Sequence, residues 1–391
     1  MLQGASQYNA SKFLQRSFWF ALIALLISGT CAANHHPGAN RVEDGSIIST
    51  GFGPDGRLWR VSAGKKKVYV DHSADFGKSF SAPVLVNVQP QRIKADSENR
   101  PAIAADGKGN VYVTYPAEGE QPTAVYASIS RNSGESFSIP KPISDHAGEA
   151  NSLNGTLKLD PSGRAYVVWL DERDRKDWRE PGNSIYYAVL DGQWRNEKAA
   201  SDLCECCRLA VDFDTDGTPV LLARFIYPVR IRDHGLAWRV DGAWTSQRVT
   251  FDEWQLEACP DHGPALSIGS DRIHHITWFT EGSAHQGLFY AHSDNGQFTP
   301  PISFGNPQRM PGHPVILSQG QHIFLGWKEF DGVNVHIMVK HSQDAGKTWS
   351  QAISVASSSK ANDNPVLLTN GKRVFLSWYD RKEGYRLIPL N

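Results

Sequence analysis

The sequence predicts an all-β protein built as a β-propeller of four-stranded blades. Short apolar segments alternate with aromatic-rich runs in which every second residue is apolar, as expected of strands. A turn residue recurs at a nearly constant spacing of about 50 residues, which is typical of propellers and solenoids. A polar turn motif also recurs near both ends of the chain. After residue 33 we find no helical periodicity.

The repeat is marked by turn residues that each follow an apolar segment. These residues are Gly56, Gly109, Gly163, Gly217, Asp271, Gly320 and Gly371. Each separates an apolar run, such as 155–159, from an aromatic-rich run, such as 165–169. We therefore expect each of them to connect the first two strands of a repeating unit.

Two segments, 73–80 and 342–349, share the pattern S-x-D-x-G-x-[ST]-[FW]. In such a motif the Ser and Asp side chains hydrogen-bond backbone groups of a tight turn, and the Gly supplies a positive φ. Segment 130–137 is a weaker copy with Asn in place of Asp. We expect these turns to join the third and fourth strands of their units.

The repeat predicts seven blades. The seventh unit has room for about three strands before Asn391, given usual strand lengths. An unpaired terminal edge would favour aggregation, so we expect residues 38–46 to add the strand that completes the last blade. Six blades with an irregular terminal segment is the alternative.

Residues 1–33 predict a signal peptide, because basic residues precede an apolar core at 18–27 that is too short to span a membrane. Cleavage near Ala33 would leave 34–391 as one propeller domain, periplasmic or secreted, with no stable membrane span. Cys31 leaves a lipid-anchored form open. The formal net charge of −1 gives no basic excess, which excludes a strong case for nucleic-acid binding.

Strand order predicts which loops share a face, because connections in a four-stranded unit alternate between two ends. We call the segment before the first strand of each unit its leading loop. Leading loops hold Asn99-Arg100, 151–154, 204–208, 259–262, Gly312-His313 and Asp363-Asn364. Loops after second strands hold 171–174, Tyr227, Arg230, 232–234, Glu281, Glu329 and Asp380-Arg381. Taken singly, these charges indicate local Asp–Arg pairing on the surface. Together they predict a ligand site on this face.

Four cysteines follow the leader: Cys204, Cys206, Cys207 and Cys259. In an exported chain they first predict a disulfide from Cys259 to one of the other three. The alternative is a metal site, in which the thiolates and His262 form a tetrahedral set suited to copper or zinc. Redox-active or free thiols are the third possibility.

The turn motifs resemble the Asp box of the sialidase superfamily, also called BNR or Asp-box repeat proteins, and the resemblance extends from about Gly45 to the end of the chain. It implies a glycoside hydrolase whose arginines bind the substrate carboxylate, with a Tyr nucleophile activated by a Glu and an Asp acid. The candidate catalytic residues that it implies are Arg100, Asp171, Arg173, Arg208, Tyr227 and Arg230, with Arg381, Tyr379, Glu205 and Glu329 as further candidates. The cysteine motifs look more like a divergent group of exported bacterial sialidase-like proteins.

Three functions are therefore expected. The first is a divergent exo-sialidase or related glycoside hydrolase acting on a carboxylate-bearing glycan. The second is a non-catalytic propeller that binds a glycan or a protein, favoured because Arg100-Pro101 lacks the Ile of the family's Arg-Ile-Pro motif. The third is a copper- or zinc-binding propeller that uses the four cysteines and His262. The expected partner is a glycan or small molecule on the leading-loop face.

Overall fold

The computed structural model describes residues 46–390, except 120–121, 178–181, 191–193, 259 and 295. These residues fall within one compact unit, Gly38–Asn391. The predicted signal peptide, Cys31, Cys259 and all but Ser46 of the predicted closing strand 38–46 lie outside the described residues, so they stay predictions. In the described part of the chain, no helix has both the length and the apolar character needed to cross a membrane.

The described residues form strands and two short 3-10 helices, η1 (Pro228–Arg230) and η2 (Pro307–Arg309). The first group of strands is β1 (Ile47–Phe52), β2 (Leu58–Ala63), β3 (Val68–Ser73) and β4 (Val84–Leu85). The second is β6 (Ala102–Ala105), β7 (Val111–Glu118), β8 (Thr123–Ser130) and β9 (Lys141–Pro142), with β5 (Arg92–Ile93) also paired to β7. The third is β10 (Ser152–Leu159), β11 (Ala165–Asp171), β12 (Asn183–Val189) and β13 (Glu197–Leu203).

Four further groups follow along the chain. The fourth is β14 (Ala210–Phe213), β15 (Pro219–Tyr227), β16 (Ile231–Val240) and β17 (Ala243–Arg248). The fifth is β18 (Ala265–Ile268), β19 (His274–Glu281), β20 (Gln286–Asp294), β21 (Gln297–Phe298) and β22 (Ile302–Phe304). The sixth is β23 (Gly312–Gln319), β24 (His322–Phe330), β25 (Val335–Ser342) and β26 (Ile353–Ser358). The seventh is β27 (Val366–Thr369), β28 (Val374–Asp380) and β29 (Gly384–Pro389).

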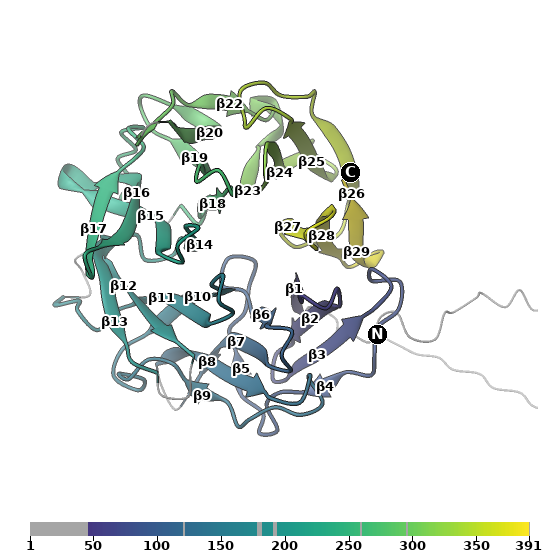
Figure 1. The fold of residues 1–391 in the computed structure, drawn as a ribbon. Helices are drawn as coiled ribbons and strands as arrows, with labels where there is room; N and C mark the ends of the chain where they lie inside the picture. Colours follow the sequence, from purple (N-terminus) through teal and green to yellow (C-terminus); the bar gives the residue numbers. More distant parts are fainter. Residues whose placement is uncertain are drawn as a thin grey trace, which may run out of the picture. The chain divides into compact units, whose positions relative to one another are not determined.

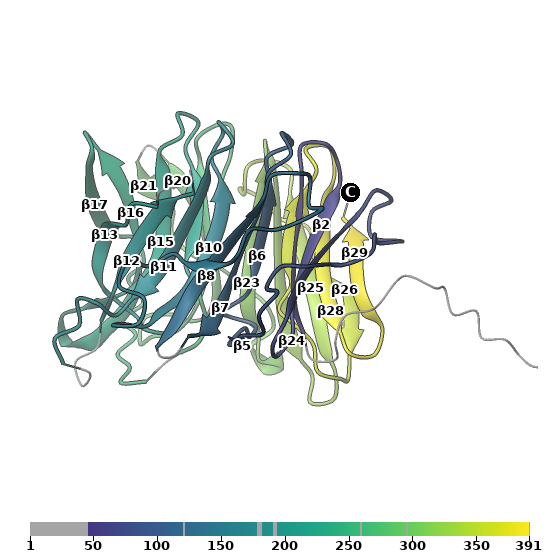
Figure 2. The same ribbon diagram turned by 90° about the horizontal axis from the view of Figure 1, so that it is seen from below.

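The predicted all-β architecture is confirmed. All strand pairs within the described residues are antiparallel, and most sheets follow sequence order across four strands. The third and fourth groups are joined into one sheet by the pair Leu203↔Phe225. Within the unit that holds the described residues, the sheets are arranged radially around a centre (Figure 1). In the perpendicular view the strands stand side by side, so the loops gather at two opposite ends (Figure 2).

The predicted turns lie between the first two strands of the groups. Gly56 has φ +81°, Gly109 +97°, Gly163 +87° and Gly217 +84°, a conformation that glycine adopts without steric cost. The fifth turn differs by one position from the prediction, since the positive φ of +65° belongs to Arg272 and not to Asp271. The Arg272 N–H closes this turn on the Gly269 carbonyl at 2.9 Å.

The Asp-box turns have the predicted hydrogen bonds. The Ser73 hydroxyl accepts from the Gly77 N–H at 2.8 Å, and Asp75 Oδ1 accepts from the Ser79 N–H at 2.9 Å. The turn after β25 repeats this geometry, with Ser342 accepting from Gly346 and Asp344 accepting from Thr348. Both turns precede the fourth strand of their group, as predicted.

The apolar core lies between successive sheets rather than within one of them. One cluster joins Trp59 and Val61 of β2 to Val113 and Tyr115 of β7, and comparable clusters join later groups. The last group packs in the same way on the first. Tyr385 of β29 shares a cluster with Leu58 of β2 and lies 3.4 Å from where a Cβ on Gly77 would be. The sheets therefore close into a ring through side-chain packing.

Candidate functional site

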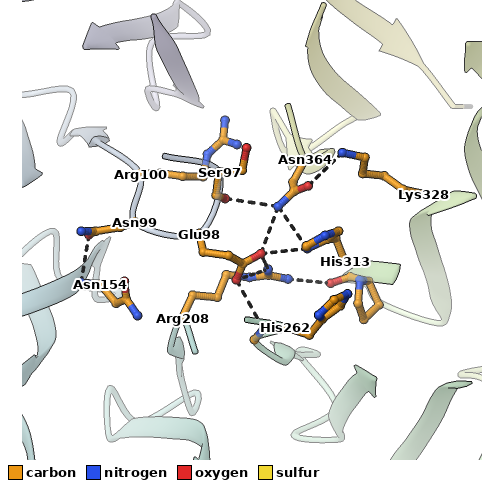
Figure 3. A network of polar contacts seen from close by, with 12 residues as sticks. Ser97, Glu98, Asn99, Arg100, Asn154, Arg208, His262, His313, Lys328 and Asn364 are labelled. Atoms are coloured by element: carbon orange, nitrogen blue, oxygen red, sulfur yellow. Dashed lines mark hydrogen bonds and ion pairs between the residues drawn. The ribbon is translucent and has the colours of Figure 1, made fainter. Parts of the chain in front are cut away.

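The leading loops of several groups meet at the centre of the ring, as predicted. The contacts that join them pass through a carboxylate that sequence reasoning did not single out. Glu98 accepts hydrogen bonds from Arg208 Nη1 at 2.7 and 2.9 Å, from His313 Nδ1 at 2.8 Å and from Asn364 Nδ2 at 3.0 Å. The Gly263 N–H is 3.4 Å from its Oε2. One side chain of the second group thus contacts the fourth, fifth, sixth and seventh groups (Figure 3).

Glu98 is almost fully buried, with 7% of its surface exposed. Burial by itself opposes ionisation, but the charge of Arg208 and the hydrogen bond from His313 outweigh it and lower the pKa of Glu98 to about 2. Glu98 is therefore a carboxylate at neutral pH, and because a carboxylate only accepts hydrogen bonds, His313 Nδ1 carries a proton. We call Glu98, Arg100, Arg208, His313, Lys328 and Asn364 the central cluster.

Arg100 connects the second group of strands to the first and the seventh groups. Its guanidinium forms an ion pair with Asp363 of the seventh group and donates to the Ile48 carbonyl of β1. Its Nε donates to the Ser49 hydroxyl at 3.2 Å. The arginine that the family resemblance nominated for substrate binding is therefore already bound to a carboxylate and a carbonyl of its own chain.

Two histidines and a phenylalanine form a stack of rings beside Glu98. His262 stacks on His313 and on Phe279, with centroids 4.4 Å apart in each case. The His262 Nδ1 donates to the Pro260 carbonyl at 2.7 Å. Burial, together with the neighbouring His313, lowers the pKa of His262 to about 4, so this imidazole is neutral at pH 7.

Lys328 of β24 carries a positive charge that is less well compensated than the charges of Arg100 and Arg208. Its Nζ donates to Asn364 Oδ1 at 3.2 Å (Figure 3). Among the described residues, no ion pair joins Lys328 to a carboxylate, in contrast to Arg100 and Arg208. Burial lowers the pKa of Lys328, which means that its charged form is held in unfavourable surroundings.

Asp171 is the last residue of β11, and it is bound to Arg173, which follows the strand. Asp171 is fully buried and accepts from Trp169 Nε1 at 2.8 Å and from Arg173 Nη2 at 2.8 Å. Arg173 also pairs with Asp145 and lies 4.0 Å over the Tyr186 ring. A Trp indole donates to a nearby carboxylate in the same way at Trp278–Asp252 and Trp327–Glu329. The same tryptophan–carboxylate hydrogen bond therefore recurs in several groups, where it stabilises the end of the sheet.

Tyr227 precedes η1 and Arg230 is its last residue. Within the described residues, neither forms a hydrogen bond or an ion pair with the central cluster. Tyr227 packs against the core of the third and fourth groups, and burial raises the pKa of its hydroxyl. Arg230 is exposed and has φ +61°. Its Nε atom lies 3.7 Å from Glu257 Oε1. Glu205, a candidate to activate the tyrosine, instead accepts from Arg232 Nη1 at 3.1 Å and from the Gly182 N–H at 3.1 Å.

Three of the five predicted metal ligands lie together. The sulfur atoms of Cys204, Cys206 and Cys207 are all within 4.8 Å of one another, so this cluster could hold a metal ion. The grouping, which covers the described residues alone, does not include His262. Cys204 and Cys207 are buried free thiols, and their sulfur atoms lie 3.4 Å apart. Cys206 is not one of the free thiols, because it has another interaction partner.

Two buried arginines stand beside these thiols. Arg232 Nη1 lies 3.0 Å from Cys204 Sγ, and Arg224 donates to the carbonyls of His262 and Phe279 at 3.1 and 2.8 Å. A hydrogen bond from Cys207, aided by the charges of Arg232 and Arg224, lowers the pKa of the Cys204 thiol. Cys204 is therefore the thiol that ionises more readily, which favours metal binding or thiol chemistry at this position.

Sequence reasoning found the loops but missed two residues at their centre. Glu98 is adjacent to the Asn99-Arg100 pair that marked its loop, and Lys328 lies between Trp327 and Glu329, which marked the end of β24. Both residues could have been found by including the charged residues next to the positions already selected as candidates. The pairing of those charges depends on contacts between distant groups and is not visible in the sequence.

Comparisons with known proteins support the fold. No protein-family model matches the chain, and no curated protein matches its sequence. Among solved structures, the chain is similar to a PL25 ulvan lyase bound to -[GlcA(1-4)Rha3S]-, with TM-score 0.53 and 11% identity over 90% of this chain and 92% of that one. It is also similar to a protein of unknown function from Dyadobacter fermentans DSM 18053, with TM-score 0.51 and 13% identity over 76% of this chain and 95% of that one.

A sialidase is also among the similar structures. The Trypanosoma rangeli sialidase in complex with the inhibitor DANA has TM-score 0.46 and 13% identity, over 75% of this chain and 54% of that one, which is too distant to support an argument about activity. Identities this low establish a shared fold alone. The chain is therefore a β-propeller related in fold to glycan-active proteins, at low identity.

Proposed function

We propose that the protein is a glycan-binding propeller, and that the central cluster binds a saccharide bearing a carboxylate. The observation that carries this proposal is Lys328, the cation of the cluster without a carboxylate partner among the described residues. Because burial disfavours its charged form, an incoming carboxylate would relieve that cost by forming a charge-assisted hydrogen bond. The ulvan lyase with the same fold is bound to a glucuronate-containing saccharide, which is consistent with this class of ligand.

Binding is favoured over sialidase-type hydrolysis by the state of the candidate catalytic residues. Arg100, Arg173 and Arg208 are each paired with a carboxylate of the chain itself, so a substrate carboxylate would have to displace an internal partner. Burial raises the pKa of Tyr227, which makes its hydroxyl a weaker nucleophile at neutral pH. The proposal therefore takes the non-catalytic alternative of the three expected functions.

We also propose that the propeller has seven blades and that the protein is exported. The seven groups of strands correspond to seven blades, and residues 38–46 would supply the missing strand beside β29. The protein is proposed to be exported by its N-terminal 33 residues and to meet its glycan outside the cytoplasm. The ligand would enter from the leading-loop face, because the central cluster is built from the leading loops, the start of β23 and the end of β24.

The test is a comparison of one saccharide with and without its carboxylate. Wild-type protein should bind a glucuronate-containing trisaccharide about 10- to 100-fold more tightly than the same trisaccharide with its carboxyl group reduced to an alcohol, because a charged hydrogen bond contributes about 1.5–3 kcal/mol. Lys328→Met should abolish the difference while keeping the aliphatic volume. Calorimetric titration gives both affinities.

The matched control is Lys340→Met on the neighbouring strand β25. Lys340 is also half-buried and lies 5.5 Å from the Trp349 ring, away from the central cluster, so its removal should leave the carboxylate preference unchanged. Equal affinity of wild-type protein for the two trisaccharides would refute the proposal. Release of new reducing ends from the trisaccharide would instead show a hydrolase.

The cysteine cluster favours a second function, the binding of copper or zinc. Cys204 and Cys207 would be its thiolate ligands, because both are buried free thiols with adjacent sulfurs. Soft thiolates suit Cu(I) and Zn²⁺. A Cu(I) ion with two thiolates keeps one negative charge, and the guanidinium of Arg232 lies against Cys204 Sγ at 3.0 Å, where it would balance that charge.

Elemental analysis after loading with Cu(I) or Zn²⁺ and removal of excess metal tests this second function. Wild-type protein should retain about one ion per chain, and Cys204→Ser or Cys207→Ser should lose it. Peptide mapping without reductant would show whether Cys259 is linked to one of the other three cysteines, the predicted disulfide. Retention of the metal by both serine variants would exclude these ligands.

A further inference from the structure

A cavity of about 670 Å³ lies between the fourth and fifth groups of strands, apart from the central cluster. Its walls come from β16 and β17 on one side and from β19, β20 and β21 on the other. The two groups are neighbours in the ring (Figure 1). This volume is within the range usual for small-molecule sites, and neither the central cluster nor the cysteines contribute to its lining.

One wall of the cavity holds an imidazole fixed by a buried carboxylate. Asp252 has 1% of its surface exposed, and its Oδ2 accepts from Trp278 Nε1 at 2.8 Å. Its Oδ1 lies 2.9 Å from His285 Nδ1. The Nε2 atom of His285 has no hydrogen bond within the described residues, and the half-exposed ring lines the cavity. His285 is therefore held in one orientation with a polar atom left for a ligand.

The remaining lining combines aromatic rings with polar groups. Trp238, Phe251 and Phe298 line the cavity, and Phe251 is 61% exposed. An aromatic ring offers a flat apolar surface, and the exposed amide of Gln247 offers both donors and an acceptor. Such a lining matches a sugar ring, which has an apolar C–H face and a rim of hydroxyls.

The charged residues of the lining already have polar partners within their own chain. Arg248 pairs with Asp233 and Glu253, and Asp214 lies 3.6 Å from His274 Nε2 and 3.9 Å from Arg272 Nε. Asp252 is held by Trp278 and His285, so each of these charged side chains has a polar partner within the chain and none is left free to select an anion or a cation. This distinguishes it from the central cluster, where Lys328 favours an anionic group.

We infer that this cavity is a second saccharide site, specific for neutral sugars, with His285 as a binding residue positioned by Asp252. The aromatic rings would contact the apolar face of the sugar, and His285 Nε2 and Gln247 would bind its hydroxyls. The inference does not depend on the function proposed for the central cluster. It predicts two binding sites of different selectivity on one propeller.

The experiment is binding of wild-type protein to immobilised neutral oligosaccharides of glucose, galactose, mannose, xylose and fucose, followed by calorimetry with the best binder. His285→Ala should weaken that binding about tenfold or more, since it removes one directed hydrogen bond. His146→Ala is the matched control, because His146 forms a comparable pair with Glu149 at 2.9 Å on the surface and does not line the cavity.

The two proposals can fail separately. Lys328→Met should leave neutral-sugar binding intact, and His285→Ala should leave the preference for the glucuronate trisaccharide intact. If no neutral oligosaccharide binds, or if His285→Ala binds like wild-type protein, the cavity is not a saccharide site, whatever the result at Lys328. Loss of neutral-sugar binding in His146→Ala would also overturn the assignment.

Discussion

Replacing Glu98 by glutamine should lower the free energy of unfolding at pH 7 by about 3 kcal/mol or more, the cost typical of removing one partner from a buried ion pair. Arg208 has 17% of its side chain exposed and would lose its counter-ion. The amide keeps one acceptor oxygen for His313 and Asn364, but its NH2 group would face the Arg208 Nη1 and Gly263 N–H donors that now lie 2.9 and 3.4 Å from Oε2. The measurement is the midpoint of chemical denaturation, followed by intrinsic tryptophan fluorescence.

The same variant should alter the response to acid. The pKa of Glu98 is about 2 in the folded protein, below its ordinary value of 4.5. A group with a lowered pKa stabilises the fold above its unfolded pKa, and this contribution disappears as the pH falls from 4.5 towards 2. The difference in stability between wild type and Glu98→Gln should therefore shrink over that range.

Glu149→Gln is the control for both measurements. Glu149 is 75% exposed on its side chain and, among the described residues, forms an ion pair only with His146, so its replacement should change stability by less than about 0.5 kcal/mol. If Glu98→Gln were as stable as Glu149→Gln, Glu98 would not be the residue that links the leading loops.

Replacing Gly263 by alanine should destabilise the protein by about 2–3 kcal/mol, as overpacking of a tight contact does. A Cβ at this position would lie 2.1 Å from Arg208 Cγ, 2.6 Å from the Arg208 carbonyl oxygen and 2.9 Å from its backbone nitrogen. Two of these atoms belong to the backbone, so the leading loops of the fourth and fifth groups would have to separate. We also expect weaker binding of the glucuronate trisaccharide, because Arg208 and Glu98 would shift.

Gly217→Ala separates this steric effect from the general cost of losing a glycine. Gly217 has φ +84° and no atom within 4 Å of an added Cβ, so its replacement should cost about 1 kcal/mol from backbone conformation alone. Thermal denaturation of the two variants gives the comparison. Equal losses would show that the contact between Gly263 and Arg208 is not tightly packed.

The features that the sequence predicted well depend on short-range contacts. In the Asp-box turns, Ser73, Asp75, Gly77 and Ser79 bind one another within four residues, so the motif itself contains the geometry. The convergence of the leading loops followed from strand order, which fixes the end at which each loop emerges. The position of the fifth turn was wrong by one residue because no glycine marks it, and Arg272 adopts the positive φ instead.

The central cluster depends on contacts that no local pattern encodes. Glu98 lies 110 residues from Arg208 and 266 residues from Asn364, and several other carboxylates were equally plausible partners in the sequence. The candidate arginines were therefore assigned to a substrate although Arg100 and Arg208 serve the chain itself. Lys328 could not be recognised as poorly compensated until the partners of its neighbours were known.

The ion pair between Arg100 and Asp363 has a consequence for synthesis. The two residues are 263 positions apart, and a ribosome adding about 5–20 residues per second needs roughly 13–53 s to reach the second after making the first. Throughout that interval the nascent chain is an open arc whose first sheet lacks its neighbour. The ring can therefore close only after the last sheet has been made, and until then the early sheets expose apolar surface that favours aggregation.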